Sequence, residues 1–302
     1  MEPYFEKYFY YTITDKEYGL TVERFLLSIG YSRHLLIRIK QTPSGITVNG
    51  LPVYTSYILK AGDLLTVLLK EETFSANIVP SPIPFDIIYE DDDILVINKE
   101  ANIPIHPSQG NFSNTLANGA AWYFRQKGEP FVYRAVNRLD RDTTGLLILA
   151  RHGLSACILS DSIARRTIHR EYLAICDGLI PWQGTVSAPI GRLCHSSIQR
   201  CVDFEHGEPA ITHYHRISYN PKVNLSLVSL SLETGRTHQI RVHMKYIGHP
   251  LPGDFLYHPD YRLIARQALH SHRLSFCHPI TKKELHFEAP LPDDMKQAMN
   301  CL

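Results

Sequence analysis

The sequence predicts an α+β fold, with a large, mostly antiparallel mixed sheet flanked by helices and loops and preceded by a small α+β domain. Strand-like segments dominate beyond residue 85 and do not alternate regularly with helical ones, which argues against a doubly wound parallel sheet. Prolines at positions 80, 82 and 84 exclude a continuing helix or a central strand between the two regions. We therefore expect a module over residues 1–75, a linker over 76–85 and a large domain over 86–302.

The first module has two helical stretches followed by short strands. Apolar residues recur at helical spacing over residues 20–29 and again over 33–40, on either side of a Gly-Tyr-Ser break. GITVNG (45–50) predicts a short strand that ends in a tight Asn-Gly turn. Ala-Gly-Asp at 61–63 then leads into the apolar β run LLTVLLK. This order predicts a compact unit of helices followed by a sheet.

The large domain begins with a predicted hairpin, FDIIYEDDDILVINKE (85–100), in which an acidic turn joins two β runs. GLLILA (145–150) predicts a buried strand from its length and its flanking turn residues. Helices are expected over residues 116–127, 154–164 and 237–247. Further strands are predicted in REYLAICDG (170–178), ITHYHRISYN (211–220), LSLVSLSLETG (225–235) and KELHFEAP (283–290).

Composition narrows the class of protein. A hydrophobic content of 44% and a charged content of 20% are ordinary for a globular chain, and a net charge of +1 does not by itself indicate a nucleic-acid binder. None of the six cysteines forms a C-x-x-C pair, which excludes a zinc ribbon or redox motif. The N-terminus carries charges among its aromatics, unlike a signal peptide, and no stretch approaches the ~18 apolar residues of a membrane span. We expect a reduced, cytoplasmic protein.

Four segments carry candidate chemistry. Asp140 stands in a polar turn before an apolar run, where the local pattern alone favours a turn residue or ion-pair partner. Residues 234–243 hold two arginines and two histidines, and Arg236, Arg241 and Lys245 suit an anionic partner, although a solvated basic helix is the alternative. If this stretch is helical, His238 and Arg241 share a face. The other two segments are the basic run at 165–172 and the loop at 96–110 with Lys99 and His106.

Together these segments resemble the RluA-type family of RNA pseudouridine synthases. The family's loop V-N-K-P-x-G-x-x-x-H-P is matched by VINKEANIPIHP, and its H-R-L-D-x-x-T-S-G motif is matched by NRLDRDTTG (137–145). Three further matches follow in the family's order: REYLAICDG (170–178), TGRTHQIRVHMKYIGHPLPGD (234–254) and LHSHRLSFCHP (269–279). Five ordered motifs make the resemblance specific over about residues 85–290. The first 70 residues resemble, more loosely, an S4-like RNA-binding module.

Three residues depart from the family's motifs. Asn137 replaces the usual His before Arg-Leu-Asp, Thr144 replaces Ser before Gly, and Glu100 replaces the Pro after Asn-Lys. None of the three is a residue that the family's chemistry uses. They bear on the placement of the substrate more than on activity.

The resemblance implies that the protein isomerises uridine to pseudouridine in RNA and needs neither metal nor cofactor. Asp140 would act on the ribose, either by attacking C1′ or by taking a C2′ proton, and both routes stay open. Arg241 would pair with Asp140 and favour its ionised form, while Tyr172 would lie against the uracil and help to move the C5 proton. Arg138 would fill the place of the extruded base. The remaining candidates for contact with RNA are Arg141, Arg236, His238, Arg165, Arg166, Arg33, Arg38 and Lys40.

Two alternatives come from other classes of protein. A non-catalytic RNA-binding protein that retains the fold finds support in Asn137 and Glu100 only, since Asp140, Tyr172 and Arg241 are all present. A metallohydrolase is suggested by the 16 histidines, but its metal needs three or four convergent ligands. The pairs at 213/215 and 270/272 come with no motif carboxylate. We expect structured RNA as the partner, ribosomal or transfer, with no membrane and no obligatory protein partner.

Overall fold

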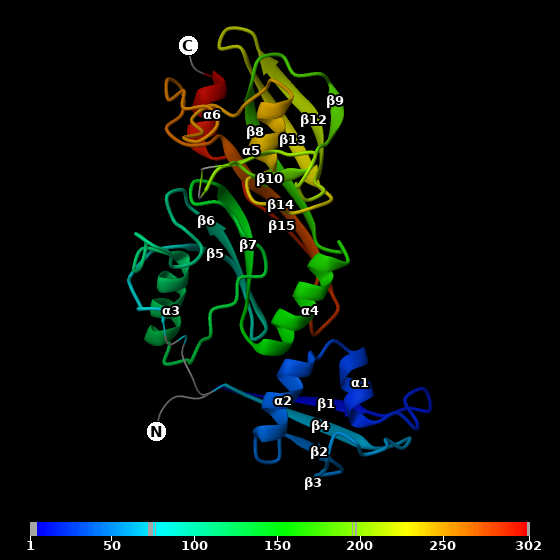
Figure 1. Cartoon of the computed structure of the whole chain (residues 1–302). Coiled ribbons are helices and arrows are strands. Elements are labelled where there is room, and N and C mark those ends of the chain that lie inside the picture. The colour runs from blue at the N-terminus through cyan, green and yellow to red at the C-terminus, as the bar shows by residue number, and fades with distance from the viewer. Residues whose placement is uncertain (1–4, 72–74, 76, 195, 197, 301–302) are drawn as a thin grey trace.

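The structure is a computed structural model that describes residues 5–71, 75, 77–194, 196 and 198–300. It has the predicted α+β architecture, with a four-stranded sheet near the N-terminus and a nine-stranded sheet in the remainder (Figure 1). Among the described residues, no helix combines the length and the apolar character needed to cross a membrane.

The small sheet has the order β1-β4-β2-β3, and two helices pack on it. Its elements are β1 (Phe5–Thr12), α1 (Val22–Ser28), α2 (Arg33–Gln41), β2 (Ile46–Val48), β3 (Leu51–Pro52) and β4 (Leu64–Glu71). Thr21 and Ser32 cap the two helices by accepting backbone hydrogen bonds, which explains why the helices begin where they do. The tight turn at Asn49-Gly50 is confirmed, because both residues have positive φ. The sequence analysis missed β1.

The large sheet has the order β5-β6-β7-β14-β8-β13-β12-β9, and β15 pairs with β14 outside this path. All of its described pairings are antiparallel except the one between β14 and β7. Its strands are β5 (Asp86–Glu90), β6 (Ile94–Lys99), β7 (Thr144–Ala150), β8 (His169–Asp177), β9 (Gln183–Ser187), β12 (Ile211–Asn220), β13 (Leu225–Leu232), β14 (Leu269–Cys277) and β15 (Glu284–Glu288). A separate pair is formed by β10 (Ile190–Arg192) and β11 (Arg200–Val202).

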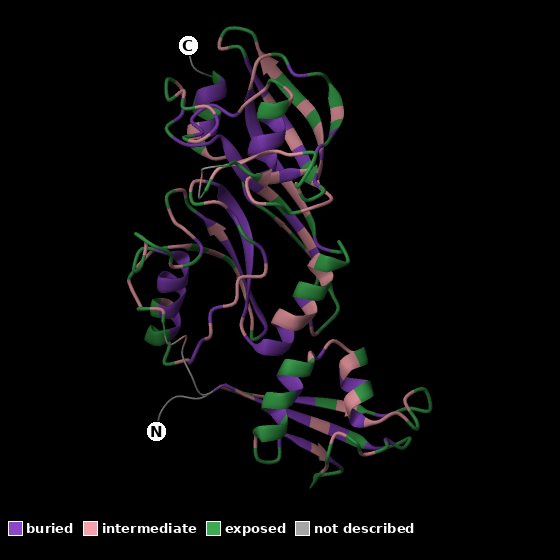
Figure 2. Ribbon diagram, in the orientation of Figure 1, coloured by how far each residue is buried: buried purple, intermediate pink, exposed green. Residues whose placement is uncertain are grey.

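Four helices flank the large sheet: α3 (Leu116–Gln126), α4 (Gly153–Ala164), α5 (Gln239–Tyr246) and α6 (Asp293–Asn300). One hydrophobic core joins α3 and α5 to one face of β6 and β7, and a second core lies on the other face of these strands. All seven residues of β7 are buried, and Figure 2 shows the continuous buried colouring of this part of the sheet. Burial on both faces accounts for the unbroken apolar run GLLILA, which predicted the strand correctly.

The proline-rich segment packs against the large domain. Ile78 and Phe85 lie against the core cluster of α3, and the side-chain amide of Asn118 donates to the carbonyl of Val79 at 2.7 Å. The expected boundary between module and linker, at residues 75 and 76, adjoins positions 72–74 and 76, which lie outside the described residues. The domain boundaries therefore stay a prediction.

The first module contacts α4 and the β5–β6 turn. Lys7 of β1 pairs with Asp93 at 2.5 Å, and Arg134 donates two hydrogen bonds, of 2.8 and 3.0 Å, to the buried carboxylate of Glu71. Leu154 of α4 belongs to the hydrophobic core of the module. In Figure 1, α4 accordingly lies between the module and the large sheet.

Candidate active site

Asp140 lies in the turn that precedes β7. Thr143 donates its backbone N–H to the carbonyl of Asp140 at 3.1 Å, which closes the turn, and the Asp140 side chain is 27% exposed. Gly145 follows with φ +108°, and a Cβ there would lie 2.2 Å from the carbonyl oxygen of Ser271 on β14. Only glycine allows β7 to approach β14 so closely. This approach sets the position of the turn relative to the centre of the sheet.

Arg241 of α5 reaches Asp140 from the other half of the large domain. Its Nη1 donates to Asp140 Oδ2 at 2.8 Å, while Nε and Nη2 donate to the two carboxylate oxygens of Asp254 at 2.7 Å each. Burial opposes the charge of Arg241, but the hydrogen bonds to Asp254 and the charge of Asp140 outweigh it and raise the pKa of the guanidinium. The rings of Phe255 and Tyr257 lie 5.5 and 4.9 Å from the guanidinium carbon. Arg241 is therefore a fixed cation that donates to both Asp140 and Asp254.

Tyr172 of β8 lies beside Asp140, and both line the same cleft. Its side chain is buried in the main core, and burial raises the pKa of its hydroxyl while a hydrogen bond from Arg170 lowers it. A largely neutral hydroxyl on an aromatic ring suits contact with a flat, uncharged base. The three predicted catalytic residues are thus brought together, from three segments that are far apart in the sequence.

His238 contacts the same group of side chains, but not from a helix face. It stands before α5 in the left-handed conformation, with φ 58°, so the expected helix from residue 237 begins two residues later. Its Nδ1 lies 2.9 Å from the hydroxyl of Tyr257, and its Nε2 lies 4.0 Å from Asp140 Oδ2. Burial lowers the pKa of His238. Left-handed backbone is rare for a residue with a side chain, and it is typical of functional sites.

The cleft beside Asp140 has a volume of about 680 Å³, and more of its lining residues are basic than acidic. Two acidic side chains, Glu171 and Glu233, also line it. Its basic lining residues are Arg138, Arg166, His169, Arg170, Arg236 and Arg273. A cleft of this charge beside a carboxylate suits a nucleotide whose phosphates face arginines.

The structure does not bring all of the predicted RNA-contacting residues to this cleft. Arg165 is exposed at the end of α4 and pairs with Asp161, while Arg141 pairs with Asp142 beside the ring of Phe255. The other three residues, Arg33, Arg38 and Lys40, are exposed on α2 in the first module. These three residues do not line the cleft.

The catalytic turn is held from behind by the buried basic side chains of Lys99 and Arg266, and this role was not predicted from the sequence. Lys99 Nζ donates to the carbonyls of Glu100 and Arg141 at 2.7 and 2.8 Å, and Arg266 donates to the carbonyl of Asp142 at 3.4 Å. Gln267 donates to the hydroxyl of Thr143 at 2.7 Å. Lys99 was expected in a loop, but it is the last residue of β6 and only 1% exposed. The Arg-Gln pair at 266–267, which nearly adjoins the late motif LHSHRL, was the sequence feature that could have indicated Arg266 and Gln267.

The residues that depart from the family motifs have defined structural contacts. The side-chain oxygen of Asn137 accepts a hydrogen bond of 2.9 Å from the backbone of Ile148, and the hydroxyl of Thr144 lies 2.8 Å from His270 Nδ1. The carbonyl of Glu100 accepts the bond from Lys99. These contacts support the turn and leave the Asp140–Arg241 pair intact.

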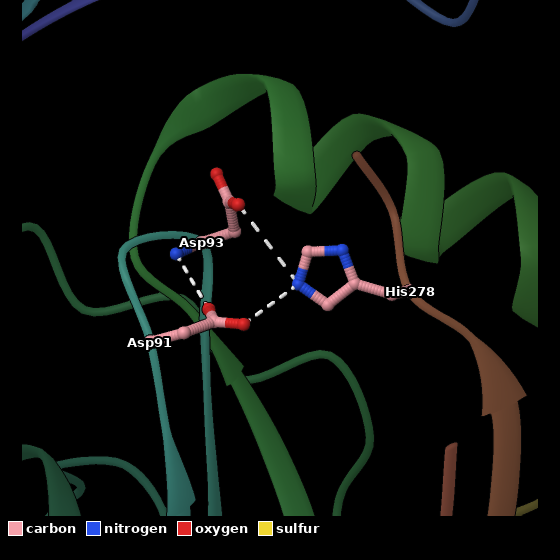
Figure 3. Close-up of side chains that lie close together, drawn as sticks. All are labelled: Asp91, Asp93 and His278. Atoms are coloured by element: carbon pink, nitrogen blue, oxygen red, sulfur yellow. Dashed lines mark hydrogen bonds and ion pairs between the residues drawn. The ribbon is translucent and has the colours of Figure 1, made fainter. Parts of the chain in front are cut away.

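Asp91, Asp93 and His278 are the group of described residues whose ligand atoms could surround a metal ion, and they lie far from Asp140 in sequence (Figure 3). Their donor atoms are already engaged. Asp93 Oδ1 pairs with Lys7 and with His152 at 2.5 and 2.7 Å, while Asp91 accepts two backbone hydrogen bonds and one from Tyr89. An ion would have to break the 2.9 Å contact between Asp91 Oδ2 and His278 Nε2, so the chemistry of the group favours an ion-pair network over a metal centre.

The histidine pairs of the metallohydrolase alternative do not converge either. His213 lies between Thr185 and Glu233, whereas His215 packs against the ring of Trp182. In the second pair, His270 bonds Thr144 and His272 bonds the carbonyl of Ala289. Each histidine therefore has its own partner, and neither pair forms a ligand set.

Comparisons with known proteins agree with this geometry. Residues 93–246 match the family model described as RNA pseudouridylate synthase. The chain is 43% identical over 279 residues to the uncharacterized RNA pseudouridine synthase YjbO of Bacillus subtilis, across 92% of this chain and 98% of that protein. It is 36% identical over 285 residues to the ribosomal large subunit pseudouridine synthase D of Neisseria meningitidis, across 90% and 75% of the two chains. Among solved structures, human RNA pseudouridylate synthase domain containing 1 matches with a TM-score of 0.59 and 26% identity, across 70% of this chain and 84% of that chain.

Fold, site and relatives together define an isomerase that acts on RNA. The chain belongs to the RNA pseudouridylate synthase family, and within it to the RluA type that its motifs resemble. The expectations of family, fold class and enzyme class are confirmed. The enzyme class disfavours the alternative of a non-catalytic protein that retains the fold.

Proposed function

We propose that the protein isomerises specific uridines of ribosomal or transfer RNA to pseudouridine, with Asp140 as the carboxylate that acts on the ribose. The observation that carries this proposal is the pair of Asp140 and Arg241 at 2.8 Å beside a cationic cleft. The carboxylate is partly exposed while its guanidinium partner is buried. A carboxylate oxygen of Asp140 is therefore held in place and remains accessible to a substrate.

The chemistry is an isomerisation in which the bond from N1 to C1′ breaks and a bond from C5 to C1′ forms. Positive charge develops on the sugar as the first bond breaks, and an ionised carboxylate stabilises it, as in glycoside cleavage. Asp140 attacks C1′ or removes a C2′ proton, and the geometry favours neither route. In the last step C5 loses its proton and N1 takes one up, so the product is an isomer of uridine. Tyr172 would help to move the C5 proton once the uracil is bound.

The target uridine must leave its stack before it can reach Asp140. Arg138 lines the cleft next to Asp140, and a planar cation there can take the vacated place in the RNA. The cleft residues Arg166 and Arg236, together with His238, would contact the extruded nucleotide and its phosphates. Arg141 and Arg165 would contact the flanking backbone.

The first module would add a second RNA contact through Arg33, Arg38 and Lys40 of α2. After β1, its two helices are followed by the strands β2, β3 and β4, and this order supports the proposal of an S4-like RNA-binding module over residues 1–75. The name of the Neisseria relative, a ribosomal large subunit pseudouridine synthase, favours ribosomal RNA over transfer RNA as the substrate. A cytoplasmic location stays a prediction.

The test uses transcripts of large-subunit ribosomal RNA and of transfer RNA that carry tritium at C5 of uridine. Pseudouridine formation releases this tritium to water. We expect release with the wild-type protein and none with Asp140→Asn, while RNA binding by filter retention is unchanged. Asp293→Asn is the matched control, because it makes the same chemical change on the exposed face of α6. Substantial release by Asp140→Asn would sink the assignment.

The substrate is identified in cells. Pseudouridines are mapped in total RNA from cells with and without this protein. Loss of one or a few positions in ribosomal RNA is the expected result. Loss confined to transfer RNA would redirect the proposal to that substrate, and no loss at all would contradict it.

A further inference from the structure

Phe255 is an aromatic residue that the proposed chemistry does not use. It follows Asp254, the residue that fixes Arg241, in the segment that runs from α5 to β14. Its side chain is 44% exposed, although it stands beside one of the most buried side chains of the protein. Phe255 therefore presents an apolar ring to solvent at the catalytic turn.

Two guanidinium groups flank this ring. The guanidinium carbon of Arg241 lies 5.5 Å from the ring centroid, and that of Arg141 lies 5.3 Å from it. Arg241 holds the carboxylate of Asp140, and Arg141 is the residue directly after Asp140. Phe255 thus lies between Arg241 and the turn that carries Asp140 and Arg141. It is not one of the residues that line the cleft containing Tyr172.

One explanation for Phe255 is that it only covers Arg241. The ring of Tyr257 already lies 4.9 Å from the Arg241 guanidinium, which also engages two carboxylates. If Phe255 only covered Arg241, any apolar side chain could take its place. Exposure of nearly half of an aromatic residue would contribute nothing to that role. Arg141 beside it donates through Nε and Nη2 to Asp142, yet 47% of its side chain is exposed. The exposed parts of Phe255 and Arg141 together are suited to a flat partner that carries a negative charge.

Extrusion of a uridine creates such a partner, because the base next to the extruded one loses a stacking neighbour. We propose that Phe255 is a specificity-determining residue that stacks on this flanking base, while Arg141 contacts the phosphate of the same nucleotide. This inference rests on the proposed function. Purines overlap an aromatic ring more than pyrimidines do, so the stack favours a purine beside the target uridine.

The stack and the cover make opposite predictions for Phe255→Leu, and both expect Phe255→Trp to be tolerated. Phe255→Leu keeps an apolar cover but removes the aromatic face, whereas Phe255→Trp keeps the face. If Phe255 stacks on a base, the Leu variant raises KM by roughly 5- to 100-fold, the range expected for loss of one base–aromatic stack. Its kcat stays close to that of the wild type, because the contact is equally strong in the bound ground state and the transition state. Phe255→Trp retains a low KM.

The experiment measures tritium release from the large-subunit ribosomal RNA transcript, and then from a short RNA around the mapped site. A second version of the short RNA carries an abasic residue in place of the flanking base. With the wild type, the abasic RNA should raise KM as much as Phe255→Leu does, and combining the two should add little. Trp182→Leu is the control, because Trp182 is also an exposed aromatic near an arginine, but it lies beside the edge strand β9.

The possible outcomes distinguish failure of the stacking role of Phe255 from failure of the proposed function. An unchanged KM for Phe255→Leu on the intact RNA, with an active wild type, overturns the stacking role and leaves the proposed function standing. Full additivity of the variant and the abasic RNA also overturns it, because the two changes would then remove different contacts. An inactive wild type contradicts the proposed function itself, and this inference with it.

Discussion

Arg241 Nη1 lies 2.8 Å from the carboxylate of Asp140, although 101 positions separate the two residues in the sequence. The guanidinium cannot follow a moving carboxylate, because its other two contacts tie it to the buried Asp254. Asp140 therefore meets a cation whose position is set by α5 and the segment after it. Such an arrangement provides a charge that is in place before the substrate binds.

Replacement of Arg241 tests this relationship. Arg241→Met should abolish tritium release, and it should also destabilise the protein by about 3–5 kcal/mol, because Asp254 is left as a buried and unpaired carboxylate. The double variant Arg241→Met, Asp254→Asn should recover much of the stability without recovering activity. Rates are measured by tritium release and stability by chemical denaturation. A single variant with normal rate and normal melting would show that Arg241 is not the partner.

Tyr172→Phe removes one hydroxyl from a buried ring. Because the ring and its packing remain, folding and RNA binding should change little, whereas tritium release should fall by roughly 10²-fold or more, the usual contribution of a group that moves a proton. Tyr214→Phe, a partly buried tyrosine on β12, is the control. Equal rates for the two variants would remove Tyr172 from the proton transfer.

Lys99 predicts a specific dependence of stability on pH. Burial lowers the pKa of Lys99 to about 7, whereas a lysine in an unfolded chain titrates near about 10.4. Between these values the unfolded state binds the proton and the folded state does not, so the free energy of unfolding rises with pH there. Below pH 7 Lys99 is protonated in both the folded and the unfolded state. The free energy of unfolding then no longer depends on pH through this group.

Lys99→Met should therefore flatten the rise in the free energy of unfolding between about pH 7 and 10. It should also lower stability by about 1–3 kcal/mol, since the carbonyls of Glu100 and Arg141 lose a donor. Denaturant titrations at several pH values provide the measurement, with Lys296→Met on the exposed face of α6 as the control. A slope that matches the wild type would contradict the lowered pKa.

Gly145→Ala tests the close approach of β7 and β14. The added Cβ would lie 2.2 Å from Ser271 O and would occupy a left-handed position, so we expect a loss of well over 1 kcal/mol and a displaced catalytic turn. Gly248→Ala is the matched control, because Gly248 also has a positive φ but has no atom within 4 Å of its would-be Cβ. Similar losses in the two variants, measured by denaturation, would show that backbone strain alone matters.

Local patterns predicted much of the fold. The hairpin of β5 and β6, the buried strand β7 and the helices α2, α3 and α4 all follow from periodicity, turn residues and caps, which act within a few residues. The same patterns do not contain the order of the sheet. Hydrophobic spacing shows that a strand is buried, but it does not name the neighbour that buries it, so the place of β14 between β7 and β8 was not predictable.

The candidate site, like the fold, was predicted from the sequence only in part. Asp140, Tyr172 and Arg241 were predicted because motifs in a familiar order carry them, and not because local chemistry distinguished them from ordinary polar residues. Lys99 shows the limit most clearly. A lysine after a strand suggests a solvated side chain, and its burial depends on carbonyls contributed by a turn 42 positions later. The sequence likewise did not indicate that Asp254 pairs with Arg241, because the contact depends on the position of α5.

The position of β14 has a consequence for synthesis of the chain. Gly145 of β7 and Tyr172 of β8 lie on opposite sides of the same residue, Ser271 of β14, so the two halves of the site meet only when that strand is inserted. Both flanking strands precede β14 in the chain, so during synthesis they leave the ribosome before the strand that joins them. We therefore expect the site to assemble only after β14 has been translated and has entered the sheet.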